Sequence, residues 1–261
     1  MATLNISYEM NPPKIMRDAT FDLDSLEHDM KKFYGRISKL VSLVDGIHLT
    51  DSVLGIPRVS SISAAREIVK MHPGVRLRCS IRVRDRNLSA IMQLVSDAIL
   101  MGVDGLLIVK GDRPERPSVD SGLRPSEVVN ILNQHGFGDR IKLFLSVPCE
   151  PDPNKIKKKM EVKPYGFITQ SLGSLEQLQK IVGYVKGNNI KVASTIMVPS
   201  PKNKECAALI DLNWREYEND VYSFIRHAHD MCGEVLITSP NSFNEGIDLL
   251  SKIIGGKKRI G

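Results

Sequence analysis

Eight short apolar segments alternate with longer amphipathic segments along almost the whole chain, and this alternation most restricts the fold. The apolar segments are rich in Val, Ile and Leu, as is typical of parallel strands covered on both faces. They are Ile6–Met10, Gly46–Thr50, Arg76–Val83, Gly105–Val109, Lys142–Val147, Gly166–Thr169, Lys191–Val198 and Glu234–Thr238. Apolar residues at helical spacing predict helices at Ser25–Val44, Ser60–Met71, Asn87–Met101, Pro125–Gln134, Ser174–Lys186, Trp214–Met231 and Phe243–Ile254.

Eight strands that alternate with helical segments within 261 residues are the pattern of a (β/α)8 TIM barrel. An open, doubly wound sheet is the main alternative. The chain has no G-x-G-x-x-G motif and no P-loop, so the dinucleotide and nucleotide fingerprints typical of such sheets are missing. Because no linker or internal repeat interrupts the pattern, we predict a single domain over residues 1–261, with a flexible tail at 255–261.

Composition and charge narrow the classes of partner. The net charge of +6 is concentrated in residues 155–163 and 257–259, and only 5% of the residues are aromatic. Aromatic side chains for stacking on bases are therefore scarce, and we do not expect a nucleic-acid partner. The four cysteines form no C-x-x-C pair, so neither a metal centre nor a disulfide framework is expected. No signal peptide and no apolar stretch of membrane-spanning length is evident, which favours a cytoplasmic protein without membrane contact.

In a TIM barrel the working residues follow the C-terminal ends of the strands, and Glu9 occupies such a position. It ends the first expected strand, just before Asn11, Pro12 and Pro13. A carboxyl that neighbouring loops cover has its pKa raised by desolvation and can act as a general acid. The alternative is a carboxylate at the rim of the barrel, paired with Lys14 or Arg17.

The fourth expected strand ends in Lys110, Gly111 and Asp112. The glycine permits close approach of the backbone to a ligand, and Asp112 then presents a carboxylate at the barrel mouth. An aspartate that bonds the backbone of its own turn is an equally good interpretation of Gly-Asp before a proline.

Several of these segments, in this order, resemble motifs of the methylenetetrahydrofolate reductase family over roughly residues 5–200. The similar segments are Ile6–Lys14, Gly46–Asp51 with Ile56–Arg58, Arg84–Asn87, Leu107–Pro114, and Lys159 followed by Gly166–Gln170. The resemblance implies a TIM barrel that holds FAD and takes electrons from NADH, NADPH or another donor. It further implies reduction of 5,10-methylenetetrahydrofolate to 5-methyltetrahydrofolate, which feeds one-carbon metabolism and methionine synthesis.

The resemblance also implies roles for individual residues. Glu9 would be the general acid that protonates N10 of the substrate, and Asp112 would lie between flavin and pterin and bond the pterin amino group. Gln170 would bond the pterin. The residues expected at the flavin are Thr50, Ser80, Lys110, Asp152 and Lys159.

Three departures from the family pattern fall at positions associated with flavin. Ser80 stands where many members have His, Lys110 stands where they have Arg, and the loop of residues 147–152 is shortened. A second function class therefore stays open: a pterin-binding subunit, weak in or independent of flavin, that needs a redox or methyl-transfer partner. The carrier is either tetrahydrofolate or a methanopterin-type pterin, and the protein partners left open are further copies of this chain (a homo-oligomer) or a redox subunit. An aldolase-type phosphate-binding barrel is a third reading, disfavoured because no glycine-rich loop follows the seventh or eighth strand.

Overall fold

The computed structural model describes residues 4–16, 20–113 and 119–258. Its strands form a closed barrel in sequence order, and every neighbouring pair is parallel, including the pair that joins β8 back to β1. The strands are β1 (Ile6–Met10), β2 (Gly46–Leu49), β3 (Arg76–Arg82), β4 (Gly105–Val109), β5 (Lys142–Val147), β6 (Gly166–Ser171), β7 (Lys191–Met197) and β8 (Val235–Thr238). The predicted single-domain (β/α)8 barrel is therefore confirmed.

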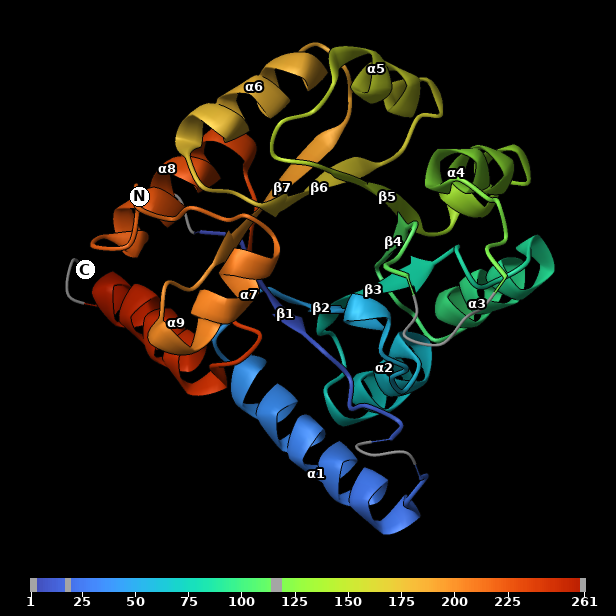
Figure 1. Ribbon diagram of the computed structural model, residues 1–261, viewed down its shortest axis with the longest axis horizontal. Coiled ribbons are helices and arrows are strands. Elements are labelled where there is room, and N and C mark those ends of the chain that lie inside the picture. Colours follow the sequence, from blue (N-terminus) through green and yellow to red (C-terminus); the bar gives the residue numbers. More distant parts are fainter. Residues whose placement is uncertain (1–3, 17–19, 114–118, 259–261) are drawn as a thin grey trace.

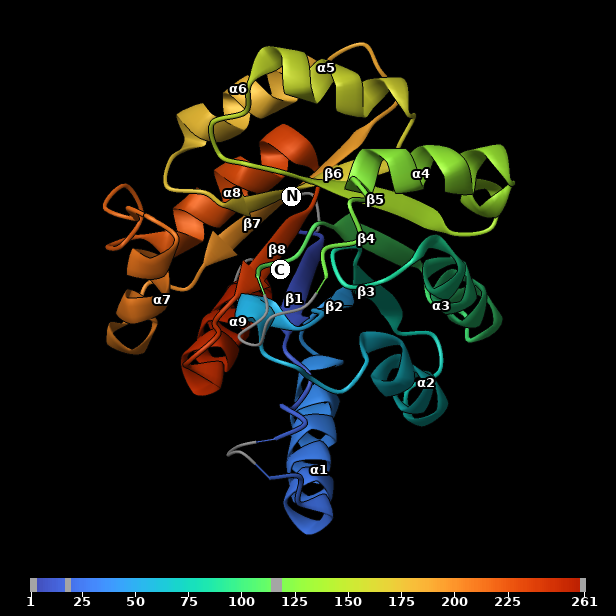
Figure 2. The same cartoon turned by 45° about the vertical axis from the view of Figure 1, so that its right-hand side comes forward.

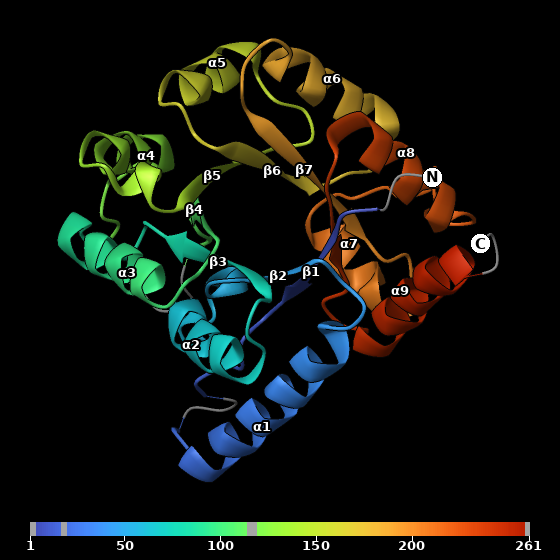
Figure 3. The same cartoon turned by 180° about the vertical axis from the view of Figure 1, so that it is seen from behind.

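The helices form a ring around the strands, as Figure 1 shows along the barrel. They are α1 (Leu23–Leu40), α2 (Ser61–Met71), α3 (Leu88–Leu100), α4 (Pro125–Gln134), α5 (Pro153–Glu161), α6 (Leu175–Val185), α7 (Lys204–Leu209), α8 (Val221–Cys232) and α9 (Phe243–Lys258). Short 3-10 turns are η1 (Val53–Gly55), η2 (Phe137–Asp139) and η3 (Pro201–Asn203). Helix α1 extends beyond the ring in all three views (Figures 1, 2 and 3). Within the described part of the chain, no helix is long and apolar enough to cross a bilayer.

The structure departs from the predicted elements in a few places. Helix α8 begins only after Asp220, whose side chain accepts a hydrogen bond from the Ser223 amide and caps the helix. Trp214 and Tyr217, which had suggested an earlier start, are buried in the turn before it. The sequence did not predict α5 and α7, and α9 continues through the first part of the expected tail, whereas residues 259–261 lie outside the described residues.

The barrel interior changes from ionic to apolar between its N-terminal end and its middle. At the N-terminal end, Glu234 accepts hydrogen bonds from Arg78 at 2.6 Å and from Ser7 at 2.8 Å. The buried guanidinium of Arg78 is tolerated there because the partly buried carboxylate of Glu234 satisfies it. The next layer is an apolar cluster formed by Leu107, Phe144, Ile168, Ala193 and Leu236.

One histidine lies inside the barrel wall. The ring of His48 is fully buried and its Nε2 lies 2.9 Å from the Ser80 hydroxyl. Burial, reinforced by the nearby charge of Arg78, lowers the pKa of His48 to about 3. The imidazole is therefore neutral and helps to pack the barrel.

The closure of the barrel positions the first candidate catalytic residue. Strand β1 pairs with β8 in a register that aligns Tyr8 with Ile237, so Glu9 and Thr238 follow side by side at the C-terminal edge. These two residues are 229 positions apart in the chain. Only a closed sheet brings the ends of its first and last strands together.

Gly246 in α9 provides a test of how this helix packs on β1. A Cβ at this position would meet the Tyr8 hydroxyl and lie 2.9 Å from the Tyr8 ring. We expect Gly246→Ala to lower the free energy of unfolding by about 1–3 kcal/mol, the usual cost of overpacking. Gly183→Ala in α6, where nothing lies within 4 Å of the added Cβ, is the matched control and gains helix propensity instead.

Urea unfolding of both variants measures the difference. Tyr8→Phe in the Gly246→Ala background removes the hydroxyl and is expected to recover part of the loss. Equal stability of the Gly246→Ala and Gly183→Ala variants would contradict this packing.

Candidate functional site

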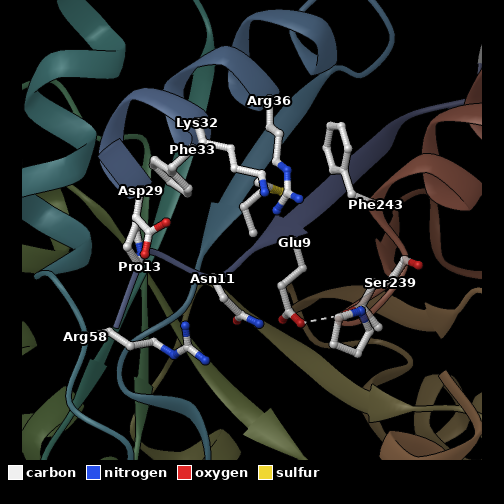
Figure 4. A pocket seen from close by; sticks show the side chains of 13 residues that line it. Glu9, Asn11, Pro13, Asp29, Lys32, Phe33, Arg36, Arg58, Ser239 and Phe243 are labelled. Atoms are coloured by element: carbon white, nitrogen blue, oxygen red, sulfur yellow. Dashed lines mark hydrogen bonds between the residues drawn. The ribbon is translucent and has the colours of Figure 1, made fainter. Parts of the chain in front are cut away.

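A polar cavity of about 250 Å³ lies where the C-terminal ends of β1 and β8 meet helices α1 and α9. Figure 4 shows side chains from these elements around the Glu9 carboxyl, and we call this space the Glu9 cavity. Its lining residues are Glu9, Met10, Asn11, Pro13, Asp29, Lys32, Phe33, Arg36, Arg58, Thr238, Ser239, Pro240 and Phe243.

Glu9 is enclosed by protein yet reaches this cavity. The Thr238 hydroxyl donates a hydrogen bond of 2.8 Å to its carboxyl, drawn as a dashed line in Figure 4. Burial raises the pKa of Glu9 above its ordinary value, and the bond from Thr238 offsets only part of that rise. Within the described residues Glu9 forms no ion pair, and Arg17, one of the two expected partners, lies outside them. A carboxyl with these properties can hold a proton and deliver it to a ligand.

Three cationic side chains line the same cavity. Lys32 and Arg36 are four residues apart on α1 and therefore share one face of the helix. The Arg36 guanidinium lies over the Phe243 ring, 5.1 Å from its centroid. Arg58 donates a hydrogen bond of 2.8 Å to the Pro12 carbonyl, and burial lowers its pKa without removing its charge. The cavity thus combines a partly buried acid, Glu9, with three cations and a second carboxylate, Asp29.

Asp112 has a different environment from Glu9. It is exposed, and its carboxylate accepts a hydrogen bond of 2.8 Å from the amide of Leu54 in η1. The fully buried Arg82 donates to the carbonyls of Asp112 and Ser52, so it joins the loops that follow β4 and β2. Gly111 is needed here because its φ is +84° and a Cβ would lie 2.7 Å from Arg82. Among the described residues Asp112 bonds the neighbouring loop of Leu54; it does not line the Glu9 cavity, and its role at a pterin stays a prediction.

The first three residues expected at a flavin each have a partner within the protein. Thr50 is buried and its hydroxyl donates to Asn11 at 2.6 Å, while Ser80 is the buried partner of His48. Lys110 forms an ion pair of 2.5 Å with Asp120 in the loop before α4.

The other two residues of this group belong to α5. Asp152 is exposed and caps the helix by accepting hydrogen bonds from the amides of Asn154 and Lys155. Lys159 donates to the Ser146 carbonyl at 2.5 Å, and burial, with the charge of Lys155 beside it, lowers its pKa. None of the five residues lines the Glu9 cavity or the three other cavities described for the structure.

Gln170 lies apart from Glu9. Strand β6 has an irregularity between Ile168 and Ser171, and Gln170 within it is exposed. It lines a separate cavity of about 530 Å³ together with Cys149, Gln177, Arg215 and other residues. The structure therefore does not bring Glu9, Asp112 and Gln170 into one cavity, and the pterin contact of Gln170 stays a prediction.

Sequence reasoning identified Glu9 but missed most of the cavity around it. The spacing of Lys32 and Arg36 and the position of Asn11 two residues after Glu9 were available signals. Thr238 ends the eighth strand and follows the same rule that selected Glu9. No sequence signal places Arg58 or Phe243 beside Glu9, because Arg58 comes from the loop between β2 and α2 and Phe243 from the start of α9.

Comparison with known proteins supports the fold and goes no further. No protein-family model matches the chain, and no curated protein sequence matches it. Among solved structures, an aldolase, QR15, is similar with a TM-score of 0.58 and 12% identity over 96% of each chain. A protein from Aquifex aeolicus VF5 is similar with a TM-score of 0.55 and 12% identity over 96% of this chain and 90% of that one. At such identity the likeness is one of barrel architecture.

The raised pKa of Glu9 predicts a pH-dependent effect of Glu9→Gln on stability. In the native state Glu9 keeps a proton that the unfolded chain releases near the ordinary value of about 4.3. Wild-type stability therefore falls as pH rises from that value through the raised pKa. Gln has no proton to lose, so its free energy of unfolding lacks this pH dependence. The difference, variant minus wild type, is expected to rise across this window by about 1.4 kcal/mol per pH unit.

Urea unfolding from about pH 4 to about pH 8 measures this difference. Glu161→Gln, at an exposed position of α5, is the control and should follow the wild type. A constant difference between Glu9→Gln and wild type at all pH values would show that the native pKa of Glu9 is not raised.

Proposed function

We propose that this protein is an enzyme that reduces a methylene-tetrahydropterin, such as 5,10-methylenetetrahydrofolate, to its 5-methyl form. The observation that carries the proposal is Glu9, a partly buried carboxyl with a raised pKa that lines a cavity at the C-terminal end of β1. Active sites of TIM barrels lie at this end of the barrel. The ordered resemblance over residues 5–200 selects this substrate among those that an acid can activate.

The chemistry needs an acid before it needs a reductant. The methylene carbon of the substrate is bonded to N5 and N10 in a closed ring, and hydride does not displace an unprotonated amine. Glu9 donates a proton to N10, the C–N10 bond breaks with its electron pair on nitrogen, and an iminium forms at N5. A hydride from the donor then adds to that carbon and gives the 5-methyl group, while the donor is oxidised by two electrons. Thr238 holds the carboxyl in place for the proton transfer.

The residues expected to hold FAD do not form a preformed site. Lys110 and Lys159, the two cations of the group, already bond Asp120 and the Ser146 carbonyl, and Ser80 is turned to His48 inside the barrel. A flavin phosphate would have to replace these contacts. We therefore propose a reduced nicotinamide as the hydride donor. Bound flavin is tested for separately.

The same observation favours a second candidate function, a pterin-binding subunit that serves a redox or methyl-transfer partner. In that case Glu9 would position the pterin, and the isolated protein would bind a reduced pterin without reducing it. A Schiff-base aldolase needs a desolvated lysine at the barrel mouth. Lys142 and Lys191 stand at the opposite, N-terminal ends of their strands. Burial lowers the pKa of Lys159 near the C-terminal end of β5, but its Nζ bonds the Ser146 carbonyl and it lines none of the four described cavities, so this function is less well supported.

Glu9→Gln tests the proposed function directly. The carboxamide preserves volume and can still accept the bond from Thr238, but it has no proton to donate. We expect the rate of methylene-pterin reduction to fall by about 10²–10⁴-fold, the scale for loss of a positioned acid. Anaerobic assays with NADH or NADPH, with and without added FAD, measure the rate, and an absorbance spectrum of the purified protein reports bound flavin.

Glu161→Gln again serves as the control, because it makes the same chemical change at an exposed site on α5. Equal rates for Glu9→Gln and wild type would remove Glu9 from the mechanism. A wild-type protein that binds reduced pterin but does not reduce it with any donor would favour the subunit over the enzyme.

A further inference from the structure

We propose that the Glu9 cavity binds a carboxylate or phosphate group through Lys32, Arg36 and Arg58, and that this group is carried by the tail of the substrate. The first part stands on the cavity alone, whereas the assignment to the substrate tail rests on the proposed function.

The charges around the cavity favour an anionic ligand. Three cations line it, and none of them forms an ion pair with a carboxylate among the described residues. The lining also holds two acids, Glu9 and Asp29; the surrounding protein favours the neutral form of Glu9, and the three cations outnumber the remaining carboxylate. Figure 4 shows Lys32 and Arg36 entering from the side of α1 and Arg58 from the opposite loop. An anion between them would gain charge-assisted hydrogen bonds from more than one side.

Arg58 supplies an independent observation. Its guanidinium bonds the Pro12 carbonyl through Nη1, but its Nε is buried and has no hydrogen-bond partner. A buried donor without an acceptor is destabilising, and an oxygen of a bound anion would satisfy it. Arg36 is in turn held over the Phe243 ring, which fixes the plane of its guanidinium. Both arginines are thus positioned before any ligand binds.

The chemistry of the proposed reaction places an anionic tail next to Glu9. In a folate-type substrate, N10 is the atom that Glu9 protonates, and the aminobenzoyl tail is attached to this same nitrogen. The tail ends in the carboxylates of its glutamate. A positive wall adjoining the acid therefore lies where the tail begins, and its cations can hold the tail while N10 faces Glu9.

Binding of two probes tests the site without any measurement of activity. Isothermal titration calorimetry with inorganic phosphate and with 4-aminobenzoylglutamate compares wild type, Lys32→Gln and Arg36→Gln. We expect both probes to bind wild type, with affinity that falls as salt is added, and each substitution to weaken binding about tenfold. Lys31→Gln, which removes the same charge from the neighbouring residue of α1 outside the cavity lining, is expected to bind within about twofold of wild type.

The two probes distinguish the anion site itself from its assignment to the substrate tail. Binding of phosphate alone, with no binding of 4-aminobenzoylglutamate, would overturn the assignment to the substrate tail. No binding of either probe, or equal effects of Lys31→Gln and Lys32→Gln, would overturn the anion site itself. Lys32 is exposed, so its variant keeps the test valid if Arg36→Gln fails to fold.

A kinetic measurement then connects the site to the proposed function. If the tail binds here equally in the ground state and the transition state, Lys32→Gln raises KM about tenfold and leaves kcat unchanged. An anion site that responds to Lys32→Gln in a protein without reductase activity would contradict the proposed function and leave the site standing.

Discussion

The pairing of β8 with β1 is the constraint on which the candidate site depends. Parallel strands that close into a barrel all place their C-terminal ends on one rim, and closure makes the first and last strands neighbours. Glu9 and Thr238 consequently lie side by side and share a hydrogen bond. Helices α1 and α9, which follow these two strands, then supply the rest of the cavity wall. A sheet left open between β1 and β8 would contain the same residues and no such site.

The two ends of the barrel use polar residues differently. At the N-terminal end, Arg78 and Glu234 satisfy one another inside the barrel and serve stability. At the C-terminal end, Arg82 ties the loops after β2 and β4 together through backbone carbonyls. Glu9 has a weaker set of partners than either arginine. Within the described residues, its carboxyl accepts a hydrogen bond only from the Thr238 hydroxyl. A partly buried acid that forms no direct ion pair is more costly to ionise than an exposed one, and the same property suits proton donation.

The sequence was sufficient to predict the barrel and Glu9, because both follow from local patterns: alternating elements, and a carboxyl at a strand end before two prolines. It was insufficient for the surroundings of Glu9, which depend on which loops meet at the rim. Thr238 becomes a partner only through closure, and Arg58 arrives from the loop between β2 and α2. Conversely, Lys110 was expected at a ligand, but Asp120, ten residues later, folds back and pairs with it. Such pairings between loops have no periodic signature in a sequence.

The proposed mechanism requires that the pKa of Glu9 is raised in the folded protein, and the carboxyl carbon can report this directly. NMR titration of protein labelled with ¹³C at the glutamate carboxyls, with Glu9→Gln to assign the signal, measures the pKa of this one group. Because burial without an ion pair disfavours the carboxylate, the Glu9 signal is expected to titrate above the ordinary range of glutamates. A signal that titrates at or below that range would show an ionised Glu9 and contradict its role as the acid.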